Sequence, residues 1–146
     1  MRPTVTVLAL FGALAVGYAS RRASNGADRW VRVAHDSNYD IAIDTAQIGG
    51  DEWRGYRIVY RTDHATTHNH NGLPFNREVV EAVLSCHNLS FRVASVDMSL
   101  GDGAPVARQR TEPGELGNQP WRRVEPGTIE ETAARAACDI ARRRRR

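Results

Sequence analysis

The two cysteines of the chain, Cys86 and Cys138, set the strongest constraint on its fold. A bridge between them would close a loop of about 50 residues and, by restricting the unfolded chain, would stabilise a small domain by about 4 kcal/mol. The alternatives are two reduced structural thiols or one reactive thiol beside His87. Neighbouring side chains on a strand point to opposite faces, so His87 would be poorly placed to activate Cys86. We therefore expect a disulfide between Cys86 and Cys138, formed in a compartment where thiols oxidise.

Residues 1–19 have the pattern of an export signal. Arg2 precedes an apolar run over residues 5–16, and small residues lead to a cleavage point after Ala19. The run has about a dozen residues, whereas a membrane-spanning helix needs about 20, so we favour a cleaved leader over an uncleaved anchor. Arginines just beyond the cleavage point argue for the anchor. We expect a signal peptide over residues 1–19, a linker over 20–29, and a periplasmic or secreted protein that is not stably transmembrane.

The size and composition fit one globular domain. The chain is 41% hydrophobic and 25% charged, which is typical of a folded protein and not of a disordered one. Its net charge of +3 comes from a basic C-terminal tail over residues 142–146, since the body is close to neutral or slightly acidic. We expect a solvated tail, with polyanion binding as the alternative, and no specific nucleic-acid binding. The candidate polyanion-binding residues are Arg142, Arg143, Arg144, Arg145 and Arg146.

Alternating apolar and polar residues predict a sheet of short strands. A polar turn at residues 36–38 indicates a hairpin between the first two strands. Residues 63–76 are rich in His, Asn and Thr and are predicted as a loop, as are residues 111–120. In residues 77–86 helical propensity competes with the strand pattern. The predicted strands are Trp30–His35, Tyr39–Asp44, Trp53–Arg61, Arg77–Cys86, Leu89–Met98, Val106–Gln109 and Trp121–Val124.

The end of the chain predicts a helix that begins at Ile129 and runs to the arginine tail. Thr128 and Glu131 have the spacing of a capping box, in which both side chains accept hydrogen bonds from backbone N–H groups at the helix start. The expected apolar stripe is narrow and places Cys138 on its flank. The stripe consists of Ile129, Ala133, Ala136 and Ile140. Strands followed by one helix indicate a small α+β domain.

Several segments, taken in order, resemble a known family. They are Trp30–Val33, Tyr39–Asp44, Phe91–Ser95 after Cys86, the turn Gly101–Gly103, and Trp121–Thr128 with Cys138 at the helix end. Their order and the positions of the two cysteines make the chain similar to the bacterial surface-adhesin protein E-like family over Trp30–Cys138.

The resemblance implies an α+β fold over residues 30–141, with a curved antiparallel sheet of about six strands packed against one C-terminal helix and one disulfide. It also implies an envelope or secreted protein. The best-known member of the family is an outer-membrane lipoprotein adhesin that binds host matrix proteins such as vitronectin and laminin and can dimerise. The present chain lacks the lipidated leader cysteine, and no binding segment of that adhesin can be carried over to it.

His64, His68 and His70 form the densest group of potential metal ligands, with Asp63 adjacent. Imidazoles on one loop could converge on Zn, Ni or Cu. Their spacing matches no closed structural site, and no fourth ligand is evident. We therefore favour a solvated polar loop and expect no metal and no other cofactor.

Catalytic motifs are not recognisable in the sequence, which has no Gly-x-Ser-x-Gly elbow, phosphate loop, dinucleotide fingerprint or His-Glu-x-x-His helix. Trp30, Trp53 and Trp121 each begin a predicted strand and are expected to pack in the core or on a sheet face. We expect an exported, non-enzymatic protein that binds an extracellular or envelope protein and that can form a homodimer. The alternative is a periplasmic metal- or polyanion-binding protein that uses the histidines or the arginine tail.

Overall fold

One antiparallel sheet organises the fold. The computed structural model describes residues 29–144, in which eight strands pair in the order β1-β2-β4-β5-β6-β7, with β3 on β4 and β8 on β6. The expected signal peptide and the linker up to residue 28 lie outside the described residues, as do Arg145 and Arg146. The strands are β1 (Trp30–His35), β2 (Tyr39–Asp44), β3 (Gly49–Asp51), β4 (Gly55–His70), β5 (Leu73–Ser85), β6 (Ser90–Ser99), β7 (Pro105–Arg110) and β8 (Arg122–Arg123).

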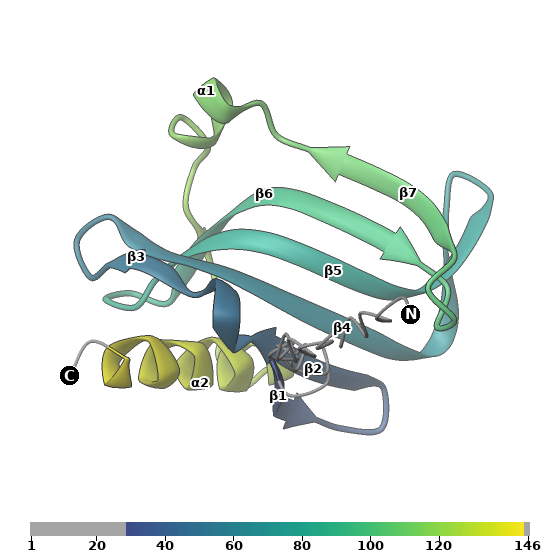
Figure 1. Cartoon of the computed structure of the whole chain (residues 1–146), viewed down its shortest axis with the longest axis horizontal. Helices are drawn as coiled ribbons and strands as arrows, with labels where there is room; N and C mark the ends of the chain where they lie inside the picture. Colours follow the sequence, from purple (N-terminus) through teal and green to yellow (C-terminus); the bar gives the residue numbers. More distant parts are fainter. Residues whose placement is uncertain (1–28, 145–146) are drawn as a thin grey trace, which may run out of the picture.

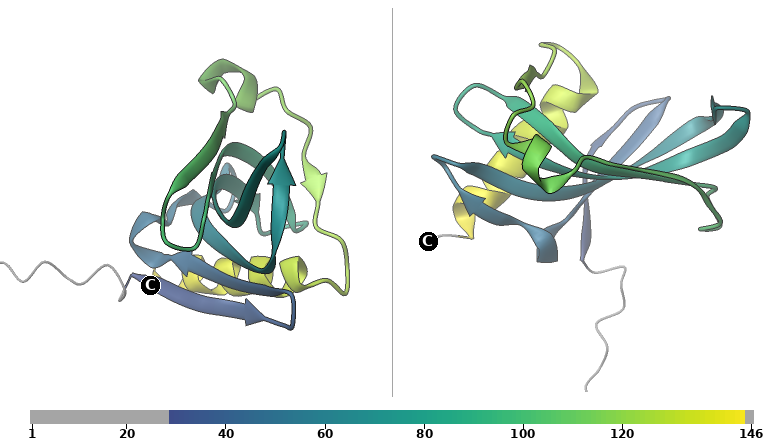
Figure 2. Two further views of the ribbon diagram at one scale, coloured as in Figure 1. Left: turned by 90° about the vertical axis from the view of Figure 1, so that its right-hand side faces the viewer. Right: turned by 90° about the horizontal axis from the view of Figure 1, so that it is seen from above.

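The long helix α2 (Ile129–Arg143) lies against the side of the sheet formed by β1 and β2 (Figure 1). A 3₁₀ turn, η1 (Thr45–Gln47), follows β2, and the short α1 (Pro113–Leu116) follows β7. The sheet is strongly curved (Figure 2). These features confirm the expected α+β fold, in which six strands form the main path and β3 and β8 extend it. In residues 29–144, no helix has the length and apolar character needed to span a membrane.

The hydrophobic core lies between α2 and one face of the sheet. The register of β4 and β5 sets Tyr56 opposite Leu84 and Ile58 opposite Ala82, so alternate residues of both strands face the helix. Burying each larger apolar side chain stabilises the fold by about 1.5 to 3 kcal/mol. The other buried members of this cluster are Ile43, Val80, Val124, Ala134, Ala137, Cys138 and Ala141.

The rotation of α2 about its axis differs from the expected one. The predicted stripe, Ile129, Ala133, Ala136 and Ile140, is only half-buried. The buried residues of the helix are Ala134, Ala137, Cys138 and Ala141. Cys138 thus lies at the centre of the buried face and not on its flank, because the bridge to the sheet turns this side of the helix inward.

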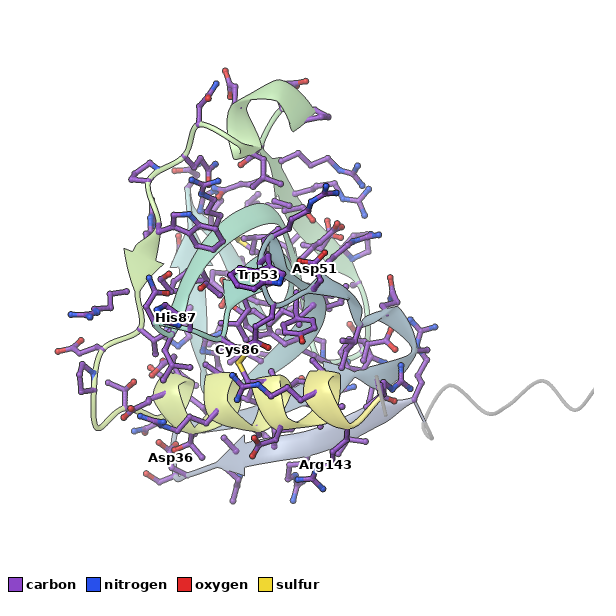
Figure 3. The ribbon with its side chains drawn as sticks, turned by 90° about the vertical axis from the view of Figure 1, so that its left-hand side faces the viewer. Asp36, Asp51, Trp53, Cys86, His87 and Arg143 are labelled. Atoms are coloured by element: carbon purple, nitrogen blue, oxygen red, sulfur yellow. A yellow bond between two sulfur atoms is a disulfide. The ribbon has the colours of Figure 1, made fainter. Side chains whose placement is uncertain are left out.

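The disulfide joins α2 to the end of β5. Cys86 directly follows β5, its Cα atom lies 5.7 Å from that of Cys138, and the two sulfurs are bonded. Figure 3 shows the bond beside the helix. The predicted bridge is confirmed, and the alternatives of reduced or reactive thiols do not apply to this structure.

The predicted loop over residues 63–76 is wrong, because β4 continues to His70 and β5 begins at Leu73. The hairpin turn between them is Asn71-Gly72, where φ is 52° and 84°, as a two-residue turn between twisted strands requires. The strand bends before the turn, since residues 64–67 lie opposite Asn76 alone. The polar composition of residues 63–76 therefore favoured a loop, although the Asn-Gly pair was a local signal of a hairpin.

Asp44, at the end of β2, is a buried carboxylate. Gln47 Nε2 and Arg29 Nε donate to it over 2.6 Å and 2.8 Å, and the Ala46 N–H donates over 3.0 Å. Burial acts to raise the pKa of Asp44, but these hydrogen bonds outweigh burial and hold the pKa below its usual range. Asp44 thereby fixes the chain at the start of β1 to the turn after β2.

Candidate functional site

Trp53 is the most exposed large apolar residue of the described chain. It stands on the turn between β3 and β4 with 94% of its surface exposed (Figure 3). Asp51 Oδ1 fixes this turn by accepting hydrogen bonds from the N–H groups of Trp53 (2.9 Å) and Arg54 (2.7 Å). The expectation that Trp53 packs in the core or on the sheet is wrong, because the strand begins only at Gly55.

Trp121 brings a second exposed indole to the same region. Trp121 is 39% exposed, and the Arg92 guanidinium lies 4.4 Å from the centroid of its ring. A Cβ atom built on Gly55, two residues after Trp53, would lie 3.4 Å from Cη2 of Trp121. Trp121 therefore lies against the first residue of β4, next to the turn that carries Trp53.

Arg123 completes this region, which we call the tryptophan patch: Trp53, Arg92, Trp121 and Arg123. Arg123 is exposed and pairs with Ser90, so it shares the sheet face of Arg92. Among the ion pairs of residues 29–144, none involves Arg92 or Arg123. Tryptophan and arginine are enriched among the residues that dominate protein–protein binding energies. The patch thus has the chemistry of an interface and carries two arginines that form no ion pair within residues 29–144.

Trp30 behaves as expected for a residue packed on the sheet. It is half-buried, and Arg61 of β4 lies 5.3 Å from its ring centroid. Trp30 is not part of the tryptophan patch, since it begins β1 at the opposite edge of the sheet from β8.

The structure brings two of the three candidate histidines together and places the third apart from them. The bend of β4 brings the rings of His64 and His68 to a centroid distance of 4.3 Å. His70 lies near the hairpin tip, where its Nε2 is 3.2 Å from Nε2 of Gln109. In the part of the chain that the structure describes, no group of three or more His, Cys, Asp or Glu side chains could hold a metal ion.

The arginine tail begins inside α2. Arg142 and Arg143 form the last turn of the helix, where positive charge is favourable, and Arg144 caps it. Arg142 Nη2 donates to Glu52 Oε1 over 2.7 Å, and this hydrogen bond raises the pKa of Arg142. Arg142 therefore helps to hold the end of α2 to the turn that carries Trp53.

A cavity of about 270 Å³ lies between α2 and the sheet. Sequence reasoning missed it, because its walls come from β2, β4, β5, β6 and the first half of α2. Its polar groups include Tyr60, His64, Glu78 and Glu130. Strand alternation could have placed Tyr60 and His64 on one face, but the register with β5 was needed to add Glu78.

Comparison with known families adds an independent finding. The sequence model of the family described as surface-adhesin protein E matches residues 30–139, which is most of the chain. A search of curated proteins found no match. The matched region begins at β1 and ends within α2, so it contains the whole sheet and both cysteines of the disulfide. The chain therefore belongs to the surface-adhesin protein E family.

Proposed function

We propose that this chain is an exported, non-enzymatic surface protein that binds proteins outside the cell through the tryptophan patch. Membership of a surface-adhesin family supports a cell-surface or secreted protein. The disulfide supports the same compartments, since such bonds persist where thiols oxidise. The domain spans residues 30–141 in this proposal, preceded by a signal peptide over 1–19 and a linker over 20–29.

The exposure of Trp53 is the observation that carries the proposal. Placing an indole in water forgoes the free energy that burial would provide, about 25 cal/mol for each Å² of apolar surface. A partner that covers Trp53 recovers this free energy. The hydrogen bonds of Asp51 hold the turn in place beforehand, so binding loses less conformational entropy than binding by a flexible loop would.

The charge of the patch defines the partner more closely. Arg92 and Arg123 have no acidic neighbour that neutralises them among residues 29–144. We therefore propose that the bound segment is acidic and belongs to an extracellular protein. Attraction between exposed charges is screened by salt, so binding through these arginines weakens as ionic strength rises.

Binding to immobilised vitronectin and laminin, the matrix proteins that the family resemblance implies, tests the proposal. The full chain is compared with Arg123→Ser and with Arg110→Ser, which removes an exposed arginine of β7 that is not part of the patch. We expect Arg123→Ser to weaken binding about fivefold and to make it less sensitive to salt. Arg110→Ser should keep the dissociation constant within twofold of the parent value and leave its salt dependence unchanged. Equal effects of the two substitutions, or no binding of the parent protein to either matrix protein, contradict the proposal.

Export is tested separately by the N-terminal sequence of the protein recovered from cells. A mature N-terminus at Ser20 is expected if Ala19 is the cleavage point. Recovery of the protein with Met1 intact from the cell interior overturns this part of the proposal.

A further inference from the structure

The apolar walls of the cavity beneath α2 combine large side chains from the sheet with small side chains from the helix. The sheet side presents large side chains, among them Ile41, Ile43 and Val80, whereas the apolar residues of the helix side are all alanines, Ala133, Ala134 and Ala137. Alanine is too short to fill the space above the sheet, so about 270 Å³ remains open. A cavity of about 150 Å³ lined by apolar side chains accommodates benzene. This cavity therefore has room for an aromatic ring with a short side chain.

The polar end of the cavity is formed across three elements. Strand register places His64 of β4 opposite Tyr39 and Thr62 opposite Glu78 of β5, and Glu130 comes from the first turn of α2. His64 Nε2 lies 3.0 Å from Glu78 Oε2, which accepts the hydrogen bond from the ring.

His64 holds the Glu78 carboxylate in place at this site. Its side chain is only 9% exposed and packs against the rings of Tyr39, His68 and Phe75. Nδ1 is buried away from the open space of the cavity, so His64 acts on this end of the cavity through the hydrogen bond between Nε2 and Glu78.

The charge of the lining favours a cation. Glu78 and Glu130 are its acidic residues, and the lining contains no lysine or arginine. Burial, with Glu78 and then Glu130, raises the pKa of Tyr60 to about 12, so the phenol stays neutral. Glu130 and Glu131 also offset the positive end of the α2 dipole at this end of the cavity.

We propose that this cavity binds a small organic amine, with its ammonium group held by Glu78 and Glu130 and its apolar body between the sheet and the alanines of α2. An ammonium group has three donors and no acceptor, which matches two carboxylates at one end of an apolar space. The volume suits an aromatic or branched aliphatic body with roughly ten non-hydrogen atoms. This site is separate from the tryptophan patch and does not depend on the proposed function.

Calorimetric titration of the full chain with three probes that share a 2-phenylethyl group tests the proposal. The probes are 2-phenylethylamine, 2-phenylethanol and 3-phenylpropionate, which differ in the charge of the head group. We expect the amine to bind at least tenfold more tightly than the alcohol, since hydrogen bonds between charged groups are stronger than neutral ones, and the carboxylate not to bind. Equal binding of amine and alcohol overturns the proposal, as does failure of the amine to bind.

Substitutions locate the binding. Glu78→Gln and Glu130→Gln should each weaken amine binding about fivefold to tenfold and leave the alcohol unchanged; Glu130 is exposed, so its substitution leaves the fold intact. Ala133→Leu places a larger side chain in the cavity and should abolish amine binding. Ala136→Leu, on the same helix but outside the lining, is the matched control and should bind as the parent does. Amine binding that survives Ala133→Leu, or is unchanged in Glu130→Gln, places the amine elsewhere and overturns the proposal.

Discussion

Cys86 and Cys138 connect the end of β5 to the centre of the buried face of α2. The bond therefore does more than hold the helix near the sheet, because it also determines which side of the helix faces inward. That rotation turns the alanines of α2 toward the sheet and so contributes to the cavity above Val80.

Removal of the disulfide should lower the stability of the domain substantially. The bridge spans a sequence separation of 52 residues. A loop of this length stabilises by about 4 kcal/mol in the chain-entropy account. We expect the double variant Cys86→Ala, Cys138→Ala to lose about that much free energy of unfolding in urea. The parent protein in reducing agent should show the same loss, and a loss below about 1 kcal/mol in both would contradict the structural role of the bond.

Asp44 should make the domain sensitive to acid. Its folded-state pKa is lowered, so its contribution to stability is present above the unfolded pKa, near 3.9, and is lost as pH falls through the folded pKa. Asp44→Asn should lower the free energy of unfolding at pH 7 by about 1 to 3 kcal/mol and should flatten the decline below pH 4. Asp139→Asn, on the exposed side of α2, is the control and should follow the parent protein. Identical acid profiles for Asp44→Asn and the parent would argue against this assignment.

Tyr60 should limit stability at high pH. Its pKa rises from 10.0 to about 12 on folding, so its contribution is complete below pH 10 and is lost as pH rises toward 12. Urea unfolding from pH 9 to pH 11.5 should show a steeper loss for the parent than for Tyr60→Phe. The difference between them should approach 2 kcal/mol, because each pKa unit corresponds to about 1.36 kcal/mol. Parallel curves would mean that Tyr60 titrates alike in the folded and unfolded chain.

Gly55 should tolerate no side chain. Its φ is +93°, and an added Cβ would lie 2.7 Å from Cγ1 of Val83. Gly55→Ala should therefore cost about 1 to 3 kcal/mol in thermal or urea unfolding. Gly49→Ala, in the neighbouring strand, has no atom within 4 Å of the added Cβ and should change stability little. If both variants were equally stable, the close approach at Gly55 would not be a constraint.

Local patterns in the sequence predicted the regular elements well. The bounds of β1 and β2 agree residue for residue with the predicted strands, because alternation is clear where one face is buried. The hydroxyl half of the capping box also formed, since the Glu131 N–H donates to Thr128 Oγ1 over 3.2 Å. The Glu131 carboxylate instead accepts from the N–H of Gly127, one residue before the N-cap, over 2.8 Å.

Features that depend on several elements could not be predicted in this way. The cavity requires the register between β4 and β5 and the rotation of α2, and neither follows from local alternation. Trp53 lies on a turn held by Asp51, so β4 begins at Gly55 and not at Trp53 as predicted. The hairpin of β4 and β5 was predicted as a loop because the His and Thr residues on its exposed faces give it the composition of a loop.

Comparison of two exposed apolar residues tests whether the tryptophan patch is the binding surface. Trp53 belongs to the patch, whereas Leu73 is 48% exposed and begins β5 beside the hairpin tip. Trp53→Ala and Leu73→Ala should both leave the free energy of unfolding nearly unchanged.

The measurement is the dissociation constant of each variant for immobilised vitronectin and laminin, with the full chain in solution. Removal of a dominant aromatic contact costs at least about 2 kcal/mol, so Trp53→Ala should weaken binding at least tenfold. Leu73→Ala should stay within twofold of the parent. Binding of Trp53→Ala that equals that of the parent would contradict the account.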